Sequence, residues 1–424
     1  MISFEVGTRR PLGLAPSFGF GDRLGLATPG HLAALRSAGH GIRGIFAQQS
    51  IRELTRTSRT PEEVMQAAID ALTVSRYTDP WSADADHLKT SEDVVRMATA
   101  GFIFFTLDPS EAVDQHADSY DAEALAAKFA AIRDEVPWVE TYRGKKIELK
   151  SGTIEFSPEA LSRAAVKYGR AIQRGITLAR RVALEAKRLE QPFEIELSVD
   201  ETSQPTSYVE HYIVADQFRK ADIKLISVAP RFEGDFEKGV DYKGDRALLE
   251  RTLKVHAEIA ERLGPYKLSL HSGSDKLSLY PLLARITDGK FHVKTSGTSY
   301  LEALRVVARR APRLFRQVVE LSRDCYDRDK ATYHVSATLV GVPAPNQIGS
   351  DQELERLYLD TWRDVPAGAG FTAPGRQILH CSFGSVLTDT QLANEIRDVL
   401  ITHPGDHEEV LKDHFARHLQ ALQA

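Results

Sequence analysis

Short apolar runs that end abruptly in polar residues recur along this chain of 424 residues, and segments of helical period separate most of them. We expect strands at residues 17–20, 44–47, 82–85, 102–107, 193–199, 223–228, 267–270 and 291–294. The third run is polar and is predicted only because the alternation requires a strand there. Eight strand–helix repeats favour an α/β fold of the (β/α)8 TIM-barrel type over an open doubly wound sheet.

Two parts of the chain exceed a minimal barrel. The interval 108–192 is too long for one crossover, and it contains an expected hairpin over 146–156 and an expected helix over 158–189. More than a hundred residues follow the eighth strand, with further strand-like runs at 332–337 and 377–381. We therefore predict one domain over residues 1–424, with an insertion at about 108–192 and a C-terminal extension at about 310–424.

Composition excludes several classes of function. A formal net charge of −5 leaves no basic footprint for nucleic acid. No stretch approaches the length of a membrane span, and residues 1–10 lack the apolar core of a signal peptide. The two cysteines, Cys325 and Cys381, are too few for a disulfide framework, so we expect a reduced, cytoplasmic protein. The sequence leaves open whether the chain forms a homo-oligomer.

Polar residues follow the predicted strands where a parallel barrel places its catalytic groups. Asp86 and His87 follow the third run, either as an acid/base group beside a metal ligand or only as a helix cap or surface loop. Glu201 follows the fifth run, and His271 follows the seventh. His87, Glu201 and His271 would converge on one mouth of the barrel, which favours a divalent metal site of zinc, manganese, iron or nickel.

Cationic side chains near the same strand ends are candidates for binding an anionic substrate. Arg23 follows the first run beside Asp22, where the pair could hold a sugar or form only a tight turn with a surface ion pair. Asp275 and Lys276 come shortly after the seventh run, and Lys294 ends the eighth. Four more histidines are left open as site residues: His211, His292, His334 and His380.

Several stretches make the chain similar to the tagaturonate epimerase family (fructuronate–tagaturonate epimerases). They are residues 17–31, Ala85-Asp-His-Leu-Lys89, Val199-Asp-Glu-Thr202, His271-Ser-Gly-Ser-Asp-Lys276 and His292-Val-Lys-Thr295. The resemblance runs from about residue 11 to the C-terminus. It departs from the family pattern at Tyr208-Val209, where a Thr-Pro-like stretch is expected before Glu210-His211.

The resemblance implies a metal-dependent barrel enzyme that interconverts D-fructuronate and D-tagaturonate, which differ at C4. The C2 ketone does not acidify the C4 hydrogen, so retro-aldol cleavage of the C3–C4 bond and recombination are expected. By analogy with class II aldolases, the implied roles are acid/base catalysis for Asp86 and, second, Asp275; metal binding for His87, Glu201 and His271; and substrate binding for Arg23, Lys276 and Lys294.

Three alternatives stay open. A class II-type metal-dependent aldolase acting on a related sugar acid shares the first half-reaction and would release both fragments. A sugar isomerase would move hydrogen between C1 and C2 instead. A sugar-binding protein built on a barrel would bind its ligand without a metal ion.

Overall fold

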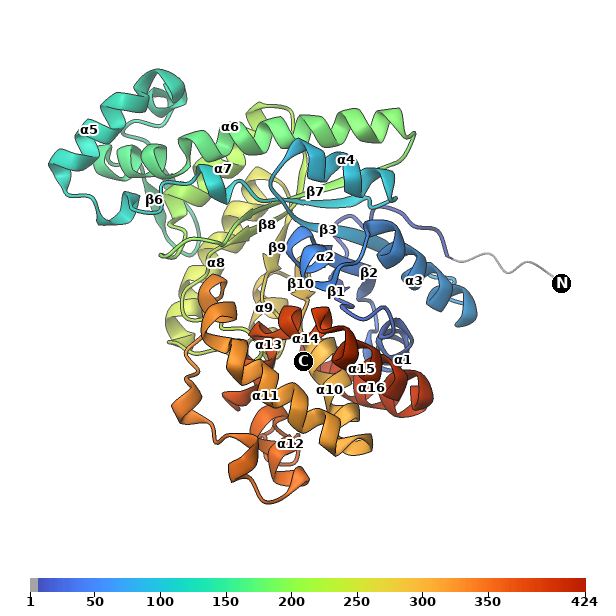
Figure 1. Ribbon diagram of the computed structural model, residues 1–424. Helices are drawn as coiled ribbons and strands as arrows, with labels where there is room; N and C mark the ends of the chain where they lie inside the picture. Colours follow the sequence, from blue (N-terminus) through green and yellow to red (C-terminus); the bar gives the residue numbers. More distant parts are fainter. Residues whose placement is uncertain (1–6) are drawn as a thin grey trace.

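The computed structural model describes residues 7–424, so the expected lack of a signal segment rests partly on residues outside the described range. Eight parallel strands close a barrel in the order β1-β10-β9-β8-β7-β4-β3-β2 (Figure 1). They are β1 Ser17–Phe20, β2 Arg43–Ser50, β3 Ser82–Leu88, β4 Phe104–Leu107, β7 Glu194–Val199, β8 Leu225–Pro230, β9 Lys267–Leu270 and β10 Phe291–Thr295. The predicted (β/α)8 fold is confirmed, and each predicted run overlaps one barrel strand.

The polar strand β3 belongs to the barrel because its two faces carry different side chains. Alternate residues of a strand point to opposite faces, and Ala83 and Ala85 are fully buried in the main hydrophobic core. Asp84 and Asp86 point into the barrel, where the ammonium group of Lys294 lies 2.7 Å from a carboxylate oxygen of each. The strand is therefore polar because its inner face carries charge.

Helices cover the outside of the barrel. The predicted helix over 61–74 is α3 (Pro61–Val74), which begins with a capping box between Thr60 and Glu63 and buries one apolar face. The others associated with the barrel strands are α1 Thr28–Ala38, α2 Ile51–Thr57, α4 Ser91–Thr99, α7 Tyr208–Lys220, α8 Arg246–Leu263, α9 Tyr280–Ile286 and α10 Thr298–Arg310. The helices expected near 91–100, 246–263 and 299–308 are thus confirmed.

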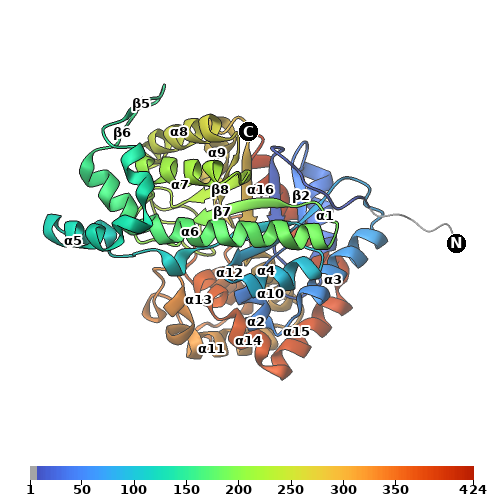
Figure 2. The same cartoon turned by 90° about the horizontal axis from the view of Figure 1, so that it is seen from above.

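The residues between β4 and β7 add a hairpin and a long helix to the barrel. The hairpin pairs β5 (Lys146–Glu148) with β6 (Thr153–Glu155), and α6 (Pro158–Arg188) follows it, as predicted. α6 packs against α4 and α7 along the outside of the barrel, as the long green helix of Figures 1 and 2. α5 (Ala122–Ile132) projects away from the strands in both views.

Helices also form the chain after α10, and they gather on the side opposite α6 (Figure 1). They are α11 Pro312–Asp329, α12 Asp351–Leu359, α13 Gly375–Cys381, α14 Phe383–Thr388, α15 Thr390–Thr402 and α16 Pro404–Ala421. The strand-like readings of 332–337 and 377–381 are wrong, because the first segment is irregular after a 3₁₀ turn and the second is α13. A short apolar run does not separate a buried strand from a buried helix.

Short 3₁₀ helices complete the described chain, at Ser110–Ala112, Ala117–Ser119, Arg133–Glu135, Pro137–Thr141, Leu277–Leu279, Lys330–Thr332, Leu339–Gly341 and Pro345–Gln347. The last helix, α16, packs against α1 and α10. Within residues 7–424, no helix is both long enough and apolar enough to cross a membrane.

Candidate active site

A cavity opens at the C-terminal ends of the barrel strands. It consists of two pockets of about 370 and 460 Å³ that share lining residues, among them Asp86, His87, Glu201 and Lys238. His271 and Lys294 line the larger pocket, and Arg23 lines the smaller one. Six of the eight predicted site residues therefore lie around one cavity, at the face where barrel enzymes carry their catalytic groups.

An irregularity in β3 turns two successive residues toward this cavity. The pairing of β3 with β4 shifts register between Ala85 and Leu88, and His87 has a φ of 53°. Such a left-handed backbone is unfavourable for a residue with a side chain and is concentrated at functional sites. The imidazole Nδ1 of His87 lies 3.0 Å from Asp108 Oδ2, and its Nε2 lies 3.8 Å from Asp86 Oδ1.

His271 enters the cavity from the end of β9. Its Nε2 lies 2.7 Å from Glu196 Oε1, and its Nδ1 lies 3.3 Å from Asp200 Oδ1. The rings of His271 and His87 are 5.0 Å apart between centroids, at 76° to each other. Each ring has one nitrogen held at 3.0 Å or less by a buried carboxylate, and its other nitrogen makes only a longer contact, with Asp86 or Asp200.

These residues have the composition of a metal site. Asp86, His87 and His271 each offer a ligand atom, and the three atoms lie within 4.8 Å of one another. His87 also belongs to a second such group with Asp108 and Glu201. The Glu201 side chain is 32% exposed and pairs with Arg52 and Lys89 at 3.3 and 3.4 Å.

The charges around the two histidines favour a cation. Burial alone would lower the pKa of His87, but the Asp86 and Asp108 carboxylates outweigh it and raise this pKa to about 10. Burial likewise opposes protonation of His271, yet Asp200 raises its pKa to about 9. A divalent metal ion would meet the same excess of negative charge and displace these protons. The residues therefore fit a metal ion in donor type and in charge.

Lys294 lies inside the barrel below the two histidines. Its ammonium group contacts carboxylates of Asp84 and Asp86 at 2.7 Å and of Glu196 at 2.9 Å, and it also bonds Thr106. Burial would lower the pKa of Lys294, but the three carboxylates raise it above its usual range. The same contact holds the pKa of Asp86 well below its usual range, against the opposing effect of burial.

Asp275 and Lys276 lie apart from the cavity. Asp275 is 0% exposed and pairs with Arg376 of α13 at 3.0 Å and with His414 of α16 at 3.3 Å. The ammonium group of Lys276 donates to the backbone carbonyls of Glu237 and Val240. Both side chains connect the loop after β9 to neighbouring segments, so the structure does not bring them to the other predicted site residues.

Arg23 reaches the cavity although its neighbour forms a turn. Asp22 accepts backbone hydrogen bonds from Leu24, Gly25 and Ala27. The Arg23 side chain is buried, donates from Nε to Glu53 at 2.9 Å, and lies over the Phe383 ring. Asp22 thus forms the turn considered for this pair, and the binding role stays a prediction for Arg23.

The four histidines left open occupy different places. His211 is buried in α7 beside His256 and Tyr266, outside the barrel. His292 lies inside the barrel, 3.0 Å from Ser17. His334 pairs with Asp235 at the exposed rim, and His380 of α13 lines the smaller pocket.

Some residues that contact the candidate ligands are not obvious from the sequence. Glu196 of β7 and Asp200, just after the end of β7, both contact His271. Asp108 follows β4, accepts from Ser110 N at 2.9 Å and also contacts His87 at 3.0 Å. The detectable sign was a buried strand with glutamates in alternating positions, which in a closed barrel requires partners inside.

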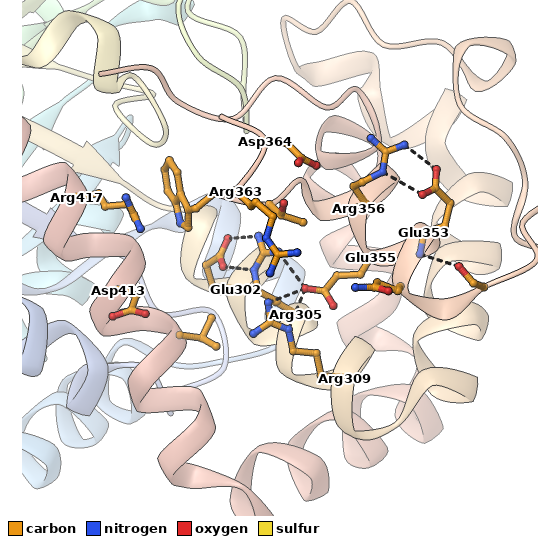
Figure 3. A pocket seen from close by; sticks show the side chains of 15 residues that line it. Glu302, Arg305, Arg309, Glu353, Glu355, Arg356, Arg363, Asp364, Asp413 and Arg417 are labelled. Atoms are coloured by element: carbon orange, nitrogen blue, oxygen red, sulfur yellow. Dashed lines mark hydrogen bonds and ion pairs between the residues drawn. The ribbon is translucent and has the colours of Figure 1, made fainter. Parts of the chain in front are cut away.

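A separate cavity of about 690 Å³ lies among α10, α12 and α16 (Figure 3). Several of its charged side chains pair with one another, for example Arg305 with Glu302 and Arg356 with Glu353. The predicted site residues all lie elsewhere. We therefore place the candidate active site at the mouth of the barrel.

A closed parallel barrel with imidazole and carboxylate groups at its C-terminal strand ends defines a (β/α)8-barrel enzyme. The model of one protein family, tagaturonate epimerase, matches residues 8–422. The chain therefore belongs to the tagaturonate epimerase family, whose members are isomerases acting on carbohydrates.

Relatives agree with this assignment. A tagaturonate/fructuronate epimerase of Thermotoga maritima is 40% identical over 412 residues, which cover 97% of this chain and 81% of the relative. The native crystal structure of the fructuronate-tagaturonate epimerase from Cohnella laeviribosi superposes with a TM-score of 0.89 at 35% identity, covering 98% of this chain and 83% of that one. A glycerol complex of the same enzyme gives the same values.

Proposed function

We propose that this chain interconverts D-tagaturonate and D-fructuronate by inverting C4, with a divalent metal ion at the barrel mouth. The family membership supports the reaction, since the relatives from Thermotoga maritima and Cohnella laeviribosi are named for it. The observation that supports the metal-dependent mechanism is that His87 belongs to two groups of possible ligand atoms, one with Asp86 and His271 and the other with Asp108 and Glu201, each within 4.8 Å.

His87, His271 and Glu201 would hold the metal ion. Two imidazole nitrogens and a carboxylate suit zinc, manganese, iron or nickel. When bound, the ion would supply a Lewis acid that polarises the C2 ketone of the substrate. Asp108 and Glu196 each hold the other nitrogen of one histidine, which orients the ring toward the cavity.

Carbon 4 determines which bond must break. Its hydrogen is β to the C2 ketone and is not acidic, so simple removal and return of this hydrogen is unfavourable. Retro-aldol cleavage is available instead: the C4 hydroxyl loses its proton, C4 becomes an aldehyde, and the electron pair of the C3–C4 bond forms the C2–C3 double bond of an enediolate, with the negative charge on the C2 oxygen. Rotation of the aldehyde and re-formation of the bond invert C4.

Asp86 carries the proton in this mechanism. Gln48 Nε2 donates to Asp86 Oδ2 at 3.0 Å, and Lys294 contacts Asp86 Oδ1 at 2.7 Å, so the carboxylate is held in one orientation. Since Lys294 holds the pKa of Asp86 below its usual range, Asp86 is ionised at neutral pH and can accept the C4 hydroxyl proton. The positive charge of Lys294 also stabilises negative charge that develops nearby.

We also propose that residues 1–424 act as one catalytic domain, with 108–192 as an insertion and about 310–424 as an extension. Cys325 and Cys381 are free thiols. This supports the expected reducing, cytoplasmic setting, with a sugar acid as the partner.

Incubation of the metal-loaded protein with D-tagaturonate in deuterated water tests the proposal. We expect D-fructuronate, no accumulation of three-carbon fragments, and no deuterium at C4. Accumulating fragments would favour the aldolase, and exchange at C1 or C2 would favour the sugar isomerase.

Metal content provides the second part of this test. We expect His271→Ala and Glu201→Ala to lower bound metal by elemental analysis and to lower activity. If both variants keep full metal and full activity, the proposed metal site is wrong.

A further inference from the structure

Cationic residues line the side of the cavity that lies away from His271. Arg23 and His380 line only the smaller pocket, His271 lines only the larger one, and Lys238 lines both. Asp86, His87 and Glu201 line both parts, and the smaller part adds the guanidinium group of Arg23 and the imidazole ring of His380. Lys238 lies where the two parts join.

Arg23 and His380 carry nitrogen atoms that the described residues do not satisfy. Arg23 is 2% exposed, and its Nη1 has no hydrogen-bond partner within residues 7–424, because Glu53 contacts only Nε. His380 is 1% exposed, and the same range of the chain offers no partner to either ring nitrogen. Buried donors without an acceptor are unfavourable and rare. These atoms therefore mark a place for an acceptor that the chain itself does not supply.

The end of β10 holds His380 in place. A side chain at Gly297 would overlap the His380 ring, so the ring packs directly on the backbone there. Gly297 is the N-cap of α10, and the first turn of this fully described helix has no acidic residue and no side-chain cap. Thr298, the first residue of this helix, donates to the Asp275 carboxylate at 3.2 Å, so the place for an acceptor is marked by the unsatisfied nitrogen atoms of Arg23 and His380.

We propose that Arg23, Lys238 and His380 bind the carboxylate of a sugar acid. This inference rests on the proposed function and names the part of the site that separates a hexuronate from a neutral ketohexose. A carboxylate accepts several hydrogen bonds and pairs well with guanidinium and ammonium groups.

The ammonium group of Lys238 can donate further hydrogen bonds to such a ligand. It donates to Ser272 Oγ at 2.5 Å, and the described chain offers it no other hydrogen bond. Lys276 and Lys294 differ in this respect, because carbonyls occupy the first and carboxylates the second. The two lysines assigned to substrate binding from the sequence are therefore less available than Lys238.

Binding of the substrate carboxylate at this subsite would affect what happens after the C3–C4 bond is cleaved. Cleavage of the C3–C4 bond leaves an enediolate of C1–C3 and a three-carbon aldehyde acid that keeps C6, the carboxylate carbon. With C6 bound, the aldehyde can rotate about its C4–C5 bond and present its other face without leaving the cavity. The carboxylate subsite thus favours recombination over release, which is the difference between an epimerase and an aldolase.

Binding of D-galacturonate and D-galactose, which differ only in the carboxylate, tests the subsite without turnover. By calorimetry on metal-loaded protein, we expect the wild type to prefer the acid at least about tenfold. Lys238→Met and His380→Leu should lower this preference below about threefold, whereas Lys238→Arg keeps it. Equal binding of both sugars by the wild type, or tighter binding of inorganic phosphate than of D-galacturonate, would overturn the inference.

Lys254→Met is the matched control. Lys254 lies on the surface of α8, where it pairs with Glu250 at 2.9 Å, and we expect its loss to leave the preference unchanged. A loss of preference in this variant equal to that of Lys238→Met would also overturn the inference.

Product partition tests the role during the reaction. With D-tagaturonate, Lys238→Met should release three-carbon fragments, raising the ratio of fragments to epimerised product at least about tenfold over wild type. A general loss of activity with no change in this ratio contradicts the inference. If the wild type does not epimerise D-tagaturonate but still prefers D-galacturonate, the proposed reaction fails and the carboxylate subsite stands.

Discussion

Lys294 on β10 and Asp86 on β3 lie 2.7 Å apart across the inside of the barrel, although their strands are not neighbours. The same ammonium group contacts Asp84 and Glu196, so one cation holds carboxylates from two strands. Although burial opposes it, this ammonium group lowers the pKa of Asp86 and of Glu196, so both acids stay ionised below the metal-binding residues.

Lys294→Met should destabilise the fold. The substitution leaves three buried carboxylates without their cation, and loss of one partner from a buried charge cluster costs about 3–5 kcal/mol. Denaturant titration measures the free energy of unfolding. Lys254→Met, which removes an exposed lysine, should change it by less than about 0.5 kcal/mol. A loss below about 1 kcal/mol for Lys294→Met would show that the cluster is protonated instead.

Asp86→Asn should lower kcat by about 10²–10⁴, the usual contribution of a positioned acid/base group. The amide keeps the size of the side chain but does not take up the C4 hydroxyl proton. Elemental analysis of the same protein should give full metal content. Loss of metal from Asp86→Asn, with full metal in Glu201→Ala, would make Asp86 the ligand and leave the proton transfer to another group.

Asp108→Asn should weaken metal binding by about 10–100-fold, because Asp108 orients the His87 ring without facing the reacting atoms. Competition with a chelator of known affinity measures this change. Asp70→Asn, on the outside of the barrel in α3, is the control and should bind metal as the wild type does. Unchanged affinity in Asp108→Asn would exclude His87 as a ligand held in this way.

Asp275→Asn separates a structural from a catalytic role. The carboxylate pairs with Arg376 at 3.0 Å in a fully buried position, so its loss should cost about 3–5 kcal/mol of stability. The kcat of the folded protein should stay within about threefold of wild type, since the side chain does not face the cavity. A drop of about 10² in kcat at unchanged KM would instead restore the acid/base role inferred from the sequence.

Stability should fall steeply below pH 6.5. Burial lowers the pKa of His31 and His418 to about 3 and of His256 and His407 to about 4. The unfolded chain binds protons at these residues from about pH 6.5 downward, while the folded chain does not. Each histidine therefore lowers the free energy of unfolding by about 1.4 kcal/mol per pH unit between pH 6.5 and its folded pKa.

Denaturant titration between pH 4 and 8 checks this expectation. His87 and His271, whose pKa values are raised to about 10 and 9, are protonated in both states below pH 6.5 and do not affect the slope there. His256→Leu should reduce the slope of the free energy of unfolding against pH by the amount that one proton contributes. A stability that stays constant from pH 7 to pH 5 would contradict the buried neutral state of these histidines.

The sequence predicted the parts of the site that strand alternation controls. His271 and Lys294 directly follow or end apolar runs, and His87 comes just after the polar third run, so counting strands was enough to place them at one mouth. Asp275 lies beyond the end of β9, after a turn in which Ser272 and Asp275 both have positive φ. The alternation of side chains along a strand therefore does not determine where Asp275 points.

The side chains that pack on the loop after β9 could not be predicted from local sequence patterns either. Its partners Arg376 and His414 come from α13 and α16, more than a hundred residues away in the chain. The apolar run that includes His380 fits a strand as well as a helix, so its place beside the cavity depends on packing that no short pattern encodes.

The cavity combines residues from two separate parts of the chain, the barrel and the segment that follows it. Asp86, His87 and His271 belong to the repeating barrel, whereas His380 and Tyr333 come from the segment after it. During synthesis, the barrel strands are complete before this segment leaves the ribosome. In evolution, exchange of the segment would alter which sugars are accepted without touching the groups that make and break the carbon–carbon bond.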